Sequence, residues 1–370
     1  MNEHELFGDA RRAPDTLSVE PFLARWQAEQ GILIDVRSPG EYENGHILGA
    51  HSVPLFSNDE RAEVGTLYKQ KGRTKAIDRG LEIVGSKLHP MVRAARQLAR
   101  RDNTDTYRPI FLHCWRGGMR SNSVAWLFRT AGLQVTVLEG GYKAYRRSFA
   151  DWMSQPWRIV VVGGFTGCGK TDVLHAMAQR GEQVLDLEAL ANHRGSAFGT
   201  MGAQPTNEQF SNMVHNALRQ FSPDRIVYCE GESLTIGKIS IPQEFYQPMQ
   251  LSPLMLYSIP TEARLLRIVK DYGVLPMEEL RAAFVRIQKR LGAERAKESL
   301  EHLDRGEIAE AAAIALQYYD KGYHKSITSK RYTEIIPMEM TLDDPEASAT
   351  AIIATMEQRN ITHTQEETNP

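Results

Sequence analysis

The chain has 370 residues, which is enough for two domains that each have a core. Its formal net charge of -2 excludes a globally basic nucleic-acid-binding protein, so any contact with RNA must be confined to one face. Three scattered cysteines argue against a disulfide framework or a zinc site. With no secretory leader pattern and no apolar run of about 18 residues, we predict a soluble cytoplasmic protein with no membrane contact.

The first part of the chain predicts an α/β domain. Short apolar, β-branched runs are typical of buried strands, and the amphipathic stretches between them are typical of helices. Because strands alternate with helices, we expect a mainly parallel sheet. The predicted strands are residues 32–36, 110–113 and 135–138, and the predicted helices are residues 91–100 and 121–130.

A second series of strands predicts a second α/β domain, with a charged helical region over residues 261–320. Pro156 prevents a helix from continuing across the connection, which places the boundary near residue 152. The predicted strands are residues 158–162, 183–187, 226–229 and 254–259. The predicted domains are residues 15–150 and 151–358, followed by a polar tail over 359–370 that we expect to be disordered.

The stretch L-H-C-W-R-G-G-M-R-S places Cys114 between a predicted strand and a helix that starts at Ser121. Backbone N–H groups and a helix N-terminus converge in such a loop and can bind an oxyanion. Nearby arginines should lower the pKa of the thiol and favour the nucleophilic thiolate. The alternative is a small buried cysteine that only packs at a strand end. The candidate loop residues are Cys114, Arg116, Gly117, Gly118, Met119 and Arg120.

Residues 15–150 resemble a rhodanese domain. Residues 34–54 (I-D-V-R-S-P-G-E-Y-E-N-G-H-I-L-G-A-H-S-V-P) match the opening block of that family, and V-L-E-G-G-Y at residues 137–142 matches its closing block. The cysteine loop is one residue longer than in typical sulfurtransferases and spells H-C-x5-R, which is typical of cysteine-dependent phosphatases. We expect the wider loop to hold a phosphate-sized or selenium-bearing group, and Asp35 and Arg37 to pair as structural support.

The stretch G-G-F-T-G-C-G-K-T at residues 163–171 contains G-x4-G-K-S/T directly after a predicted strand and before a predicted helix. In such a P-loop, backbone N–H groups wrap a diphosphate, Lys170 supplies a positive charge and Thr171 can bind Mg2+. Cys168 occupies a free position of the motif, which favours an incidental role. The predicted diphosphate-binding residues are Gly164, Thr166, Gly167, Cys168, Gly169, Lys170 and Thr171.

Polar side chains follow two further strands of the second domain. V-L-D-L-E at residues 184–188 and I-V-Y-C-E-G-E-S at 226–233 are both imperfect candidates for the acidic strand end of a nucleotide hydrolase. H-R-G-S-A-F-G at 193–199 places a cation and a proton donor near the carboxyl edge of the sheet, or else forms a solvated loop. The residues predicted to support the site are Asp186, Glu188, His193, Arg194 and Glu230.

Taken together, these motifs resemble those of the tRNA 2-selenouridine synthase family. The resemblance extends to K-R-L-G at residues 289–292 and Y-Y-D at 318–320. It implies two steps on the wobble 2-thiouridine of tRNA. The thiocarbonyl sulfur first displaces diphosphate from geranyl diphosphate, and selenium from selenophosphate then replaces the geranylthio group. Both compounds are co-substrates, and no stable prosthetic group is implied. For the second step we expect Cys114 to take up selenium as a selenylsulfide while the loop holds the departing phosphate.

A tRNA substrate requires a basic surface, and residues 281–297 offer one candidate. Its cations recur at spacings that can share helical faces. The predicted phosphate contacts are Arg286, Lys289, Arg290 and Lys297, and the tyrosines that either stack on a base or belong to the core are Tyr318, Tyr319 and Tyr323. The insertion-like residues 59–72 have no role that the sequence reveals.

Two other hypotheses for the function stay open. The first is a cysteine-dependent phosphatase joined to a P-loop kinase that acts on small phosphorylated metabolites; the H-C-x5-R spacing favours it, but no aspartate is marked as its general acid. The second is a non-enzymatic RNA-binding or regulatory P-loop protein with a vestigial rhodanese domain, against which the intact Cys114 argues.

Overall fold

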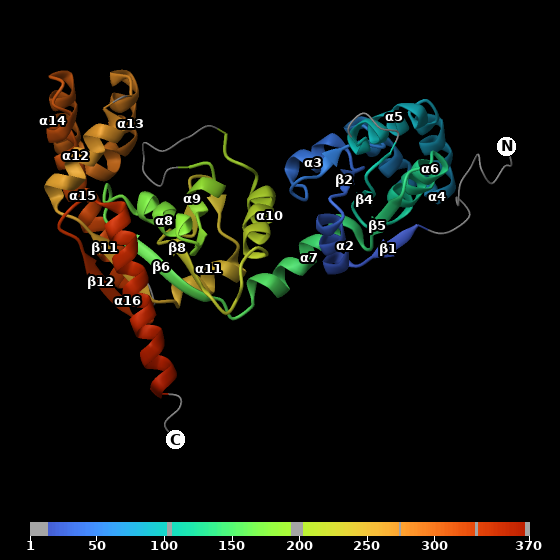
Figure 1. Cartoon of the computed structure of the whole chain (residues 1–370). Coiled ribbons are helices and arrows are strands. Elements are labelled where there is room, and N and C mark those ends of the chain that lie inside the picture. The colour runs from blue at the N-terminus through green and yellow to red at the C-terminus, as the bar shows by residue number, and fades with distance from the viewer. Residues whose placement is uncertain (1–13, 102–105, 194–202, 274, 330–331, 367–370) are drawn as a thin grey trace. The chain divides into compact units, whose positions relative to one another are not determined.

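A computed structural model describes residues 14–101, 106–193, 203–273, 275–329 and 332–366. The chain divides into two compact units, Met1–Trp152 and Met153–Pro370. Each unit is built on a five-stranded parallel sheet with helices packed against it (Figure 1), which confirms the predicted α/β class. No helix among the described residues is both long and apolar enough to cross a membrane.

The sheet of the first unit has the strand order β1-β5-β4-β2-β3, with every pair parallel. The predicted strands are confirmed as β2, β4 and β5, whereas the edge strands β1 and β3 are too short for a hydrophobic pattern to reveal them. The strands are β1 (Asp15–Leu17), β2 (Ile32–Asp35), β3 (His51–Ser52), β4 (Ile110–His113) and β5 (Val135–Leu138).

Helices cover both faces of this sheet. Successive strand residues point to opposite faces, so Leu112 packs in one core with α5 and α6, while Phe111 faces α2 and meets the ring of Phe22 edge to face at 5.3 Å. Since both faces are covered, the carboxyl ends of the strands remain as the open edge. The helices are α2 (Val19–Ala28), α3 (Pro39–Asn44), α4 (Asn58–Gly85), α5 (Leu88–Ala99), α6 (Met119–Thr130) and α7 (Gly141–Met153).

A buried ion pair fixes the loops next to β2. Arg37 donates to Asp35 at 2.6 Å, and both side chains are fully buried. The same guanidinium donates to the carbonyl of Gly45 at 2.6 Å and lies 3.8 Å from the centre of the Tyr142 ring. The paired charges therefore tie the chain around α3 to the sheet, which confirms the structural role predicted for Asp35 and Arg37.

The sheet of the second unit has the order β12-β11-β6-β8-β7 and is parallel throughout. Its central strand is the one that precedes the P-loop. The strands are β6 (Arg158–Gly164), β7 (Gln183–Leu185), β8 (Ile226–Glu230), β11 (Leu254–Ser258) and β12 (Ile335–Glu339), and a separate antiparallel hairpin contains β9 (Thr235–Ile236) and β10 (Ile239–Ser240).

In the second unit, α8 and α16 pack together in the core on one face of the sheet. The predicted helical region over 261–320 is confirmed as four helices, of which α13, α14 and α15 share a small core of their own. The helices are α8 (Lys170–Gln179), α9 (Leu187–Leu190), α10 (Asn207–Leu218), α11 (Gln243–Gln250), α12 (Thr261–Tyr272), α13 (Met277–Leu291), α14 (Ala293–Asp304), α15 (Ile308–Ser329) and α16 (Pro345–Glu366).

The C-terminal stretch differs from our expectation. We predicted a disordered tail over 359–370, but α16 continues to Glu366, and residues 367–370 lie outside the described ones. The polar composition misled the prediction, because N-I-T-H-T-Q-E-E contains no glycine or proline that would end a helix already begun.

Candidate functional site

The cysteine loop lies at the open edge of the first sheet. Cys114 directly follows the central strand β4, and α6 begins at Met119. The carbonyls of Cys114 and Trp115 accept hydrogen bonds from the backbone N–H groups of Tyr142 and Lys143 at the start of α7, at 2.8 and 2.9 Å. Because these carbonyls face α7, the N–H groups of the loop are free to face the sulfur.

The surroundings of the Cys114 sulfur favour the thiolate. Burial alone would raise the pKa of this thiol, because the residue is only 3% exposed. The Ser121 hydroxyl 3.3 Å away, the N–H groups of Arg116 and Gly118 and the charge of Arg120 outweigh burial, so the pKa lies below its ordinary value. This is the environment of a nucleophilic cysteine.

Close backbone packing also requires glycine in and beside the loop. Gly117 has a φ of 61°, and a Cβ there would lie 2.7 Å from the backbone N of Gly140. Gly141 would likewise meet the carbonyl of Cys114 at 2.4 Å. The E-G-G-Y motif thus supports the cysteine loop by close backbone packing. Gly118 has open space around it.

Arg120 is held in place from outside the loop. Its guanidinium donates to Glu41 at 2.9 Å, and Arg61 approaches the same carboxylate at 3.1 Å. Burial would raise the pKa of Glu41, but the hydrogen bond and charge of Arg120 and the N–H of Ser38 lower it to about 2. Glu41 therefore stays ionised at neutral pH and fixes one cation beside Cys114. Arg116 is exposed and unconstrained by any described ion pair.

Replacing Ser121 with alanine should raise the pKa of Cys114 by roughly one to two units, since a hydrogen bond to a charged group contributes about 1.5–3 kcal/mol. Because the hydroxyl stabilises the thiolate, its loss removes one of the groups that oppose the effect of burial and moves titration to higher pH. The pH profile of iodoacetamide alkylation, followed on the Cys114 peptide, measures the shift. Ser123→Ala, at an exposed position of the same helix, serves as the control. Superimposable profiles for Ser121→Ala and the wild type would contradict the assignment.

The P-loop of the second unit connects β6 to α8. Gly169 adopts a φ of 81° directly before Lys170, whose ammonium donates to the carbonyl of Gly164 at 3.0 Å. Burial would lower the pKa of Lys170, but the acidic groups around it raise the pKa above its ordinary value, so the charge persists. Cys168 is fully buried in the core of this unit, as an incidental role requires.

Helices α12 and α15 brace the P-loop. Arg264 donates to the carbonyl of Thr166 at 2.9 Å and makes a bidentate pair with Asp320 at 2.7 and 3.0 Å. The backbone N–H of Gly164 donates to the hydroxyl of Tyr323 at 2.5 Å. Of the three tyrosines singled out in the sequence, Tyr323 contacts the P-loop, whereas Tyr318 and Tyr319 pack against the core of α13, α14 and α15.

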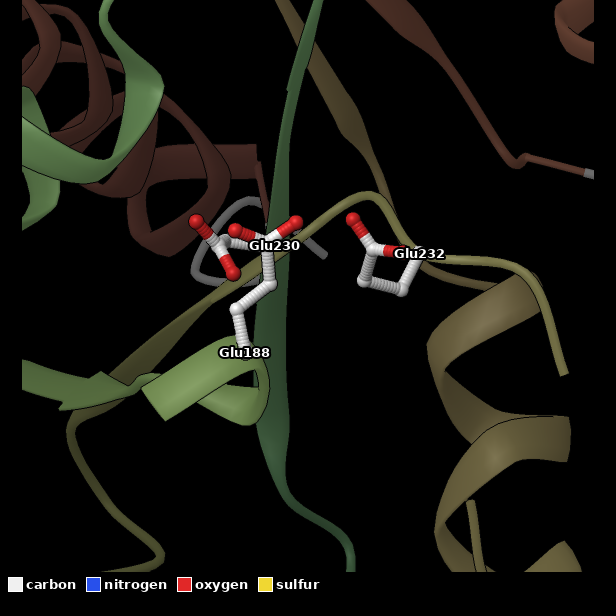
Figure 2. Close-up of side chains that lie close together, drawn as sticks. All are labelled: Glu188, Glu230 and Glu232. Carbon is white, nitrogen blue, oxygen red and sulfur yellow. The ribbon is translucent and has the colours of Figure 1, made fainter. Parts of the chain in front are cut away.

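Three carboxylates converge beside the P-loop (Figure 2). Glu188 comes from α9, Glu230 ends β8 and Glu232 follows it, with one oxygen of each within 4.8 Å of the others. Burial raises the pKa values of Glu188 and Glu230 above the ordinary range. Neighbouring carboxylates raise them further: Glu230 and Glu232 act on Glu188, and Asp186 and Glu232 act on Glu230. Glu230 accepts a hydrogen bond from Thr171 at 3.0 Å through Oε1, and its buried Oε2 has no hydrogen-bond partner.

The other predicted residues lie in different settings. Asp186 caps α9 by accepting from the N–H of Ala189 and pairs with His175, and its charge also helps to raise the pKa of Glu230. His193 lies after α9 and donates its backbone N–H to the carbonyl of Glu188. Arg194 and the side chain of Arg290 lie outside the described part of the chain. Arg286 and Lys289 are exposed on α13, while Lys297 on α14 is 3.8 Å from Glu301.

The structure adds three functional candidates that the sequence did not single out: Glu41, Ser121 and Glu232. Ser121 lies in the motif that contains Cys114, and Glu232 lies two residues after Glu230, so both could have been identified from the sequence. Glu41 precedes Arg120 by 79 residues, and only the fold brings the two side chains together.

The fold and these two loops define a two-domain protein that pairs a rhodanese-like cysteine site with a P-loop anion site. The rhodanese-like domain family matches residues 18–148, and the family described as the tRNA 2-selenouridine synthase AAA domain matches residues 157–341. The chain therefore belongs to the tRNA 2-selenouridine synthase family.

Relatives of similar length agree with this assignment. The chain is 36% identical over 296 residues to the tRNA 2-selenouridine synthase of Hydrogenovibrio crunogenus, covering 74% of this chain and 79% of that protein. It is 35% identical over 330 residues to the protein of the same name from Bordetella petrii, covering 79% and 85%. A third, from Shewanella frigidimarina, is 37% identical over 246 residues, or 65% of each chain.

Proposed function

We propose that this protein converts 2-thiouridine in tRNA to 2-selenouridine, the activity for which its relatives are named. The observation that carries the proposal is the presence, in one chain of this family, of two separate oxyanion loops with different chemistry. The loop at Cys114 offers a thiolate nucleophile, and the loop at Lys170 offers a fixed cation and backbone N–H groups.

The first step is geranylation at the P-loop. The thiocarbonyl sulfur attacks C1 of geranyl diphosphate, the C–O bond breaks, diphosphate leaves with the electron pair and the uracil ring loses its N3 proton. Lys170 and the loop N–H groups stabilise the charge that develops on the leaving diphosphate. Alkylation is chemically useful because the sulfur can later leave C2 as a neutral thiol.

The residues beside the P-loop fit a Mg2+ ion. Carboxylate oxygens are ligands that this hard cation prefers, and the buried, unpartnered Oε2 of Glu230 is a lone acceptor that a cation would satisfy. Glu188, Glu230, Glu232 and the hydroxyl of Thr171 would hold the ion. When bound, it supplies further positive charge for the diphosphate.

The second step replaces the geranylthio group with selenium from selenophosphate, through Cys114. A selenylsulfide on Cys114, which we expected from the sequence, would need a two-electron oxidant, because selenium in selenophosphate is already at the level of selenide. Attack of the thiolate on phosphorus needs no oxidant. The S–P bond forms, the P–Se bond breaks, and the electron pair leaves with selenium, which water protonates to hydrogen selenide.

Hydrogen selenide then adds to C2 of the S-geranyl base, and geranylthiol leaves with the proton. Water cleaves the S–P bond, which releases phosphate and restores Cys114. A phosphoryl group fits the seven-residue span from Cys114 to Arg120, where the N–H groups of Arg116 and Gly118 face the reacting sulfur.

Mass spectrometry of digested 2-thiouridine tRNA tests the proposal. The tRNA is incubated with the protein and with geranyl diphosphate, selenophosphate or both. We expect S-geranyl-2-thiouridine with the first compound alone and 2-selenouridine only with both. Unchanged 2-thiouridine in every sample, together with phosphate release from small phosphoesters without RNA, would favour the phosphatase reading instead.

A further inference from the structure

Helix α4 is an antiparallel helical hairpin. Gly72 in its middle has a φ of 84° and a ψ of 177°, which separates two arms, residues 58–71 and 73–85. Arg79 of the second arm donates to Glu63 of the first at 2.6 Å, and Lys87 just beyond pairs with Glu60. Since residues earlier in one arm face residues later in the other, the arms run in opposite directions. Gly72 therefore lies at the tip.

The tip of this hairpin is entirely positive. Residues 67–77 read L-Y-K-Q-K-G-R-T-K-A-I and contain four cations and no acidic residue, in a chain whose net charge is -2. All four cations are exposed, and none makes an ion pair within the described part of the chain. They are Lys69, Lys71, Arg73 and Lys75. At the base of the hairpin, by contrast, Arg79 and Lys87 are neutralised by carboxylates.

The tip lies against the cysteine loop. The guanidinium of Arg73 approaches the sulfur of Met119 at 3.7 Å, and Met119 is the first residue of α6 after the loop. Both Met119 and Tyr68 are more than half exposed. The four cations, an exposed aromatic ring and the exposed Arg116 of the cysteine loop therefore lie on neighbouring segments of the first unit.

We propose that the hairpin tip, Lys69, Lys71, Arg73 and Lys75, binds the backbone phosphates of the RNA whose modified base reaches Cys114. The inference rests on the proposed function, which brings an RNA base to that loop. Like charges so close together repel one another, and a chain of phosphates is the partner that relieves this repulsion. Tyr68 adds a ring of the kind on which unpaired bases stack.

The hairpin tip is a stronger candidate for binding RNA than the surface predicted at residues 281–297. There, Arg281 is paired with Asp304 and Lys297 lies near Glu301, so part of the positive charge is already neutralised. Among the described residues the cations of the hairpin tip have no such pairs, and the tip borders the cysteine loop at Met119.

The test compares full-length proteins for binding to 2-thiouridine tRNA over a range of salt concentrations. The tip variant carries Lys69→Gln, Lys71→Gln, Arg73→Gln and Lys75→Gln. A matched control carries Arg93→Gln, Lys238→Gln, Lys270→Gln and Lys321→Gln, four exposed cations scattered over both units. A third protein carries Arg286→Gln and Lys289→Gln. Circular dichroism and thermal melting check that each variant is folded.

We expect the slope of log K against log salt concentration to become shallower by roughly three for the tip variant, since each lost phosphate contact removes about 0.7–0.9. The matched control should keep the wild-type slope. A wild-type slope for the tip variant would overturn the proposal, as would a loss confined to the Arg286 and Lys289 variant. The wild-type protein could make no selenouridine while the tip variant still showed a shallower salt dependence of tRNA binding. In that case the proposed function would be wrong, but the tip would remain an RNA-binding surface.

Discussion

Replacing Cys114 with alanine should leave geranylation of 2-thiouridine tRNA at the wild-type rate and abolish selenation by selenophosphate. Removal of a covalent nucleophile typically lowers a rate by at least about 1000-fold, and no other described side chain in the loop offers a thiolate. Geranylation should persist, because the P-loop lies in a separate unit with its own core. The measurement is the rate of each nucleoside product by mass spectrometry.

The control for Cys114→Ala is Cys229→Ala, which removes a buried thiol on β8 of the other unit and should retain selenation. Equal loss of both steps in Cys114→Ala would contradict the division of labour between the two loops. The wild-type protein, quenched during turnover, tests the chemistry of the step. A phosphoryl group on the Cys114 peptide would support attack of the thiolate on phosphorus. The isotope pattern of selenium on that peptide would instead support the selenylsulfide expected from the sequence.

The sequence was sufficient to predict features that depend on neighbouring residues, namely the central strands and the two loops. Strands β2, β4 and β5 are buried along their whole length and mostly apolar because both faces of the sheet are covered, so each could be recognised from its own residues. The two loops could be placed for the same reason, since Cys114 and Lys170 each follow a strand within a few residues. The positions of these candidate residues at sheet edges therefore required no knowledge of distant contacts.

Contacts between distant segments could not be predicted in this way. Glu41 and Arg120 meet only because β2 and β4 are neighbours in the sheet, and no pattern in either segment indicates that order. The hairpin of α4 was missed for a related reason: its two arms are joined at Gly72, and their ion pairs link residues 16 and 27 positions apart. Glu41 of the cysteine site and the cations of the α4 hairpin are therefore side chains that only the three-dimensional fold identifies as candidates.

Replacing Lys170 with alanine should have the opposite effect on the two steps. Lys170 is the fixed cation of the P-loop, and its raised pKa keeps it charged across the neutral range. Loss of one such electrostatic contact to a developing charge costs roughly 100- to 1000-fold in rate, so geranylation should fall by that factor. Selenation of tRNA that already carries S-geranyl-2-thiouridine should proceed at the wild-type rate.

The Lys170→Ala experiment needs two supporting measurements, because the substitution removes a cation from the acidic cluster around it and can disturb the P-loop locally. Calorimetric titration with inorganic diphosphate should show weakened binding, while thermal melting reports on the fold. Lys238→Ala, at an exposed lysine of the same unit, should match the wild type in every measurement. If Lys170→Ala slowed selenation of the pre-geranylated tRNA as much as geranylation itself, the P-loop would have to act in both steps, and the assignment of one loop to each reaction would be wrong.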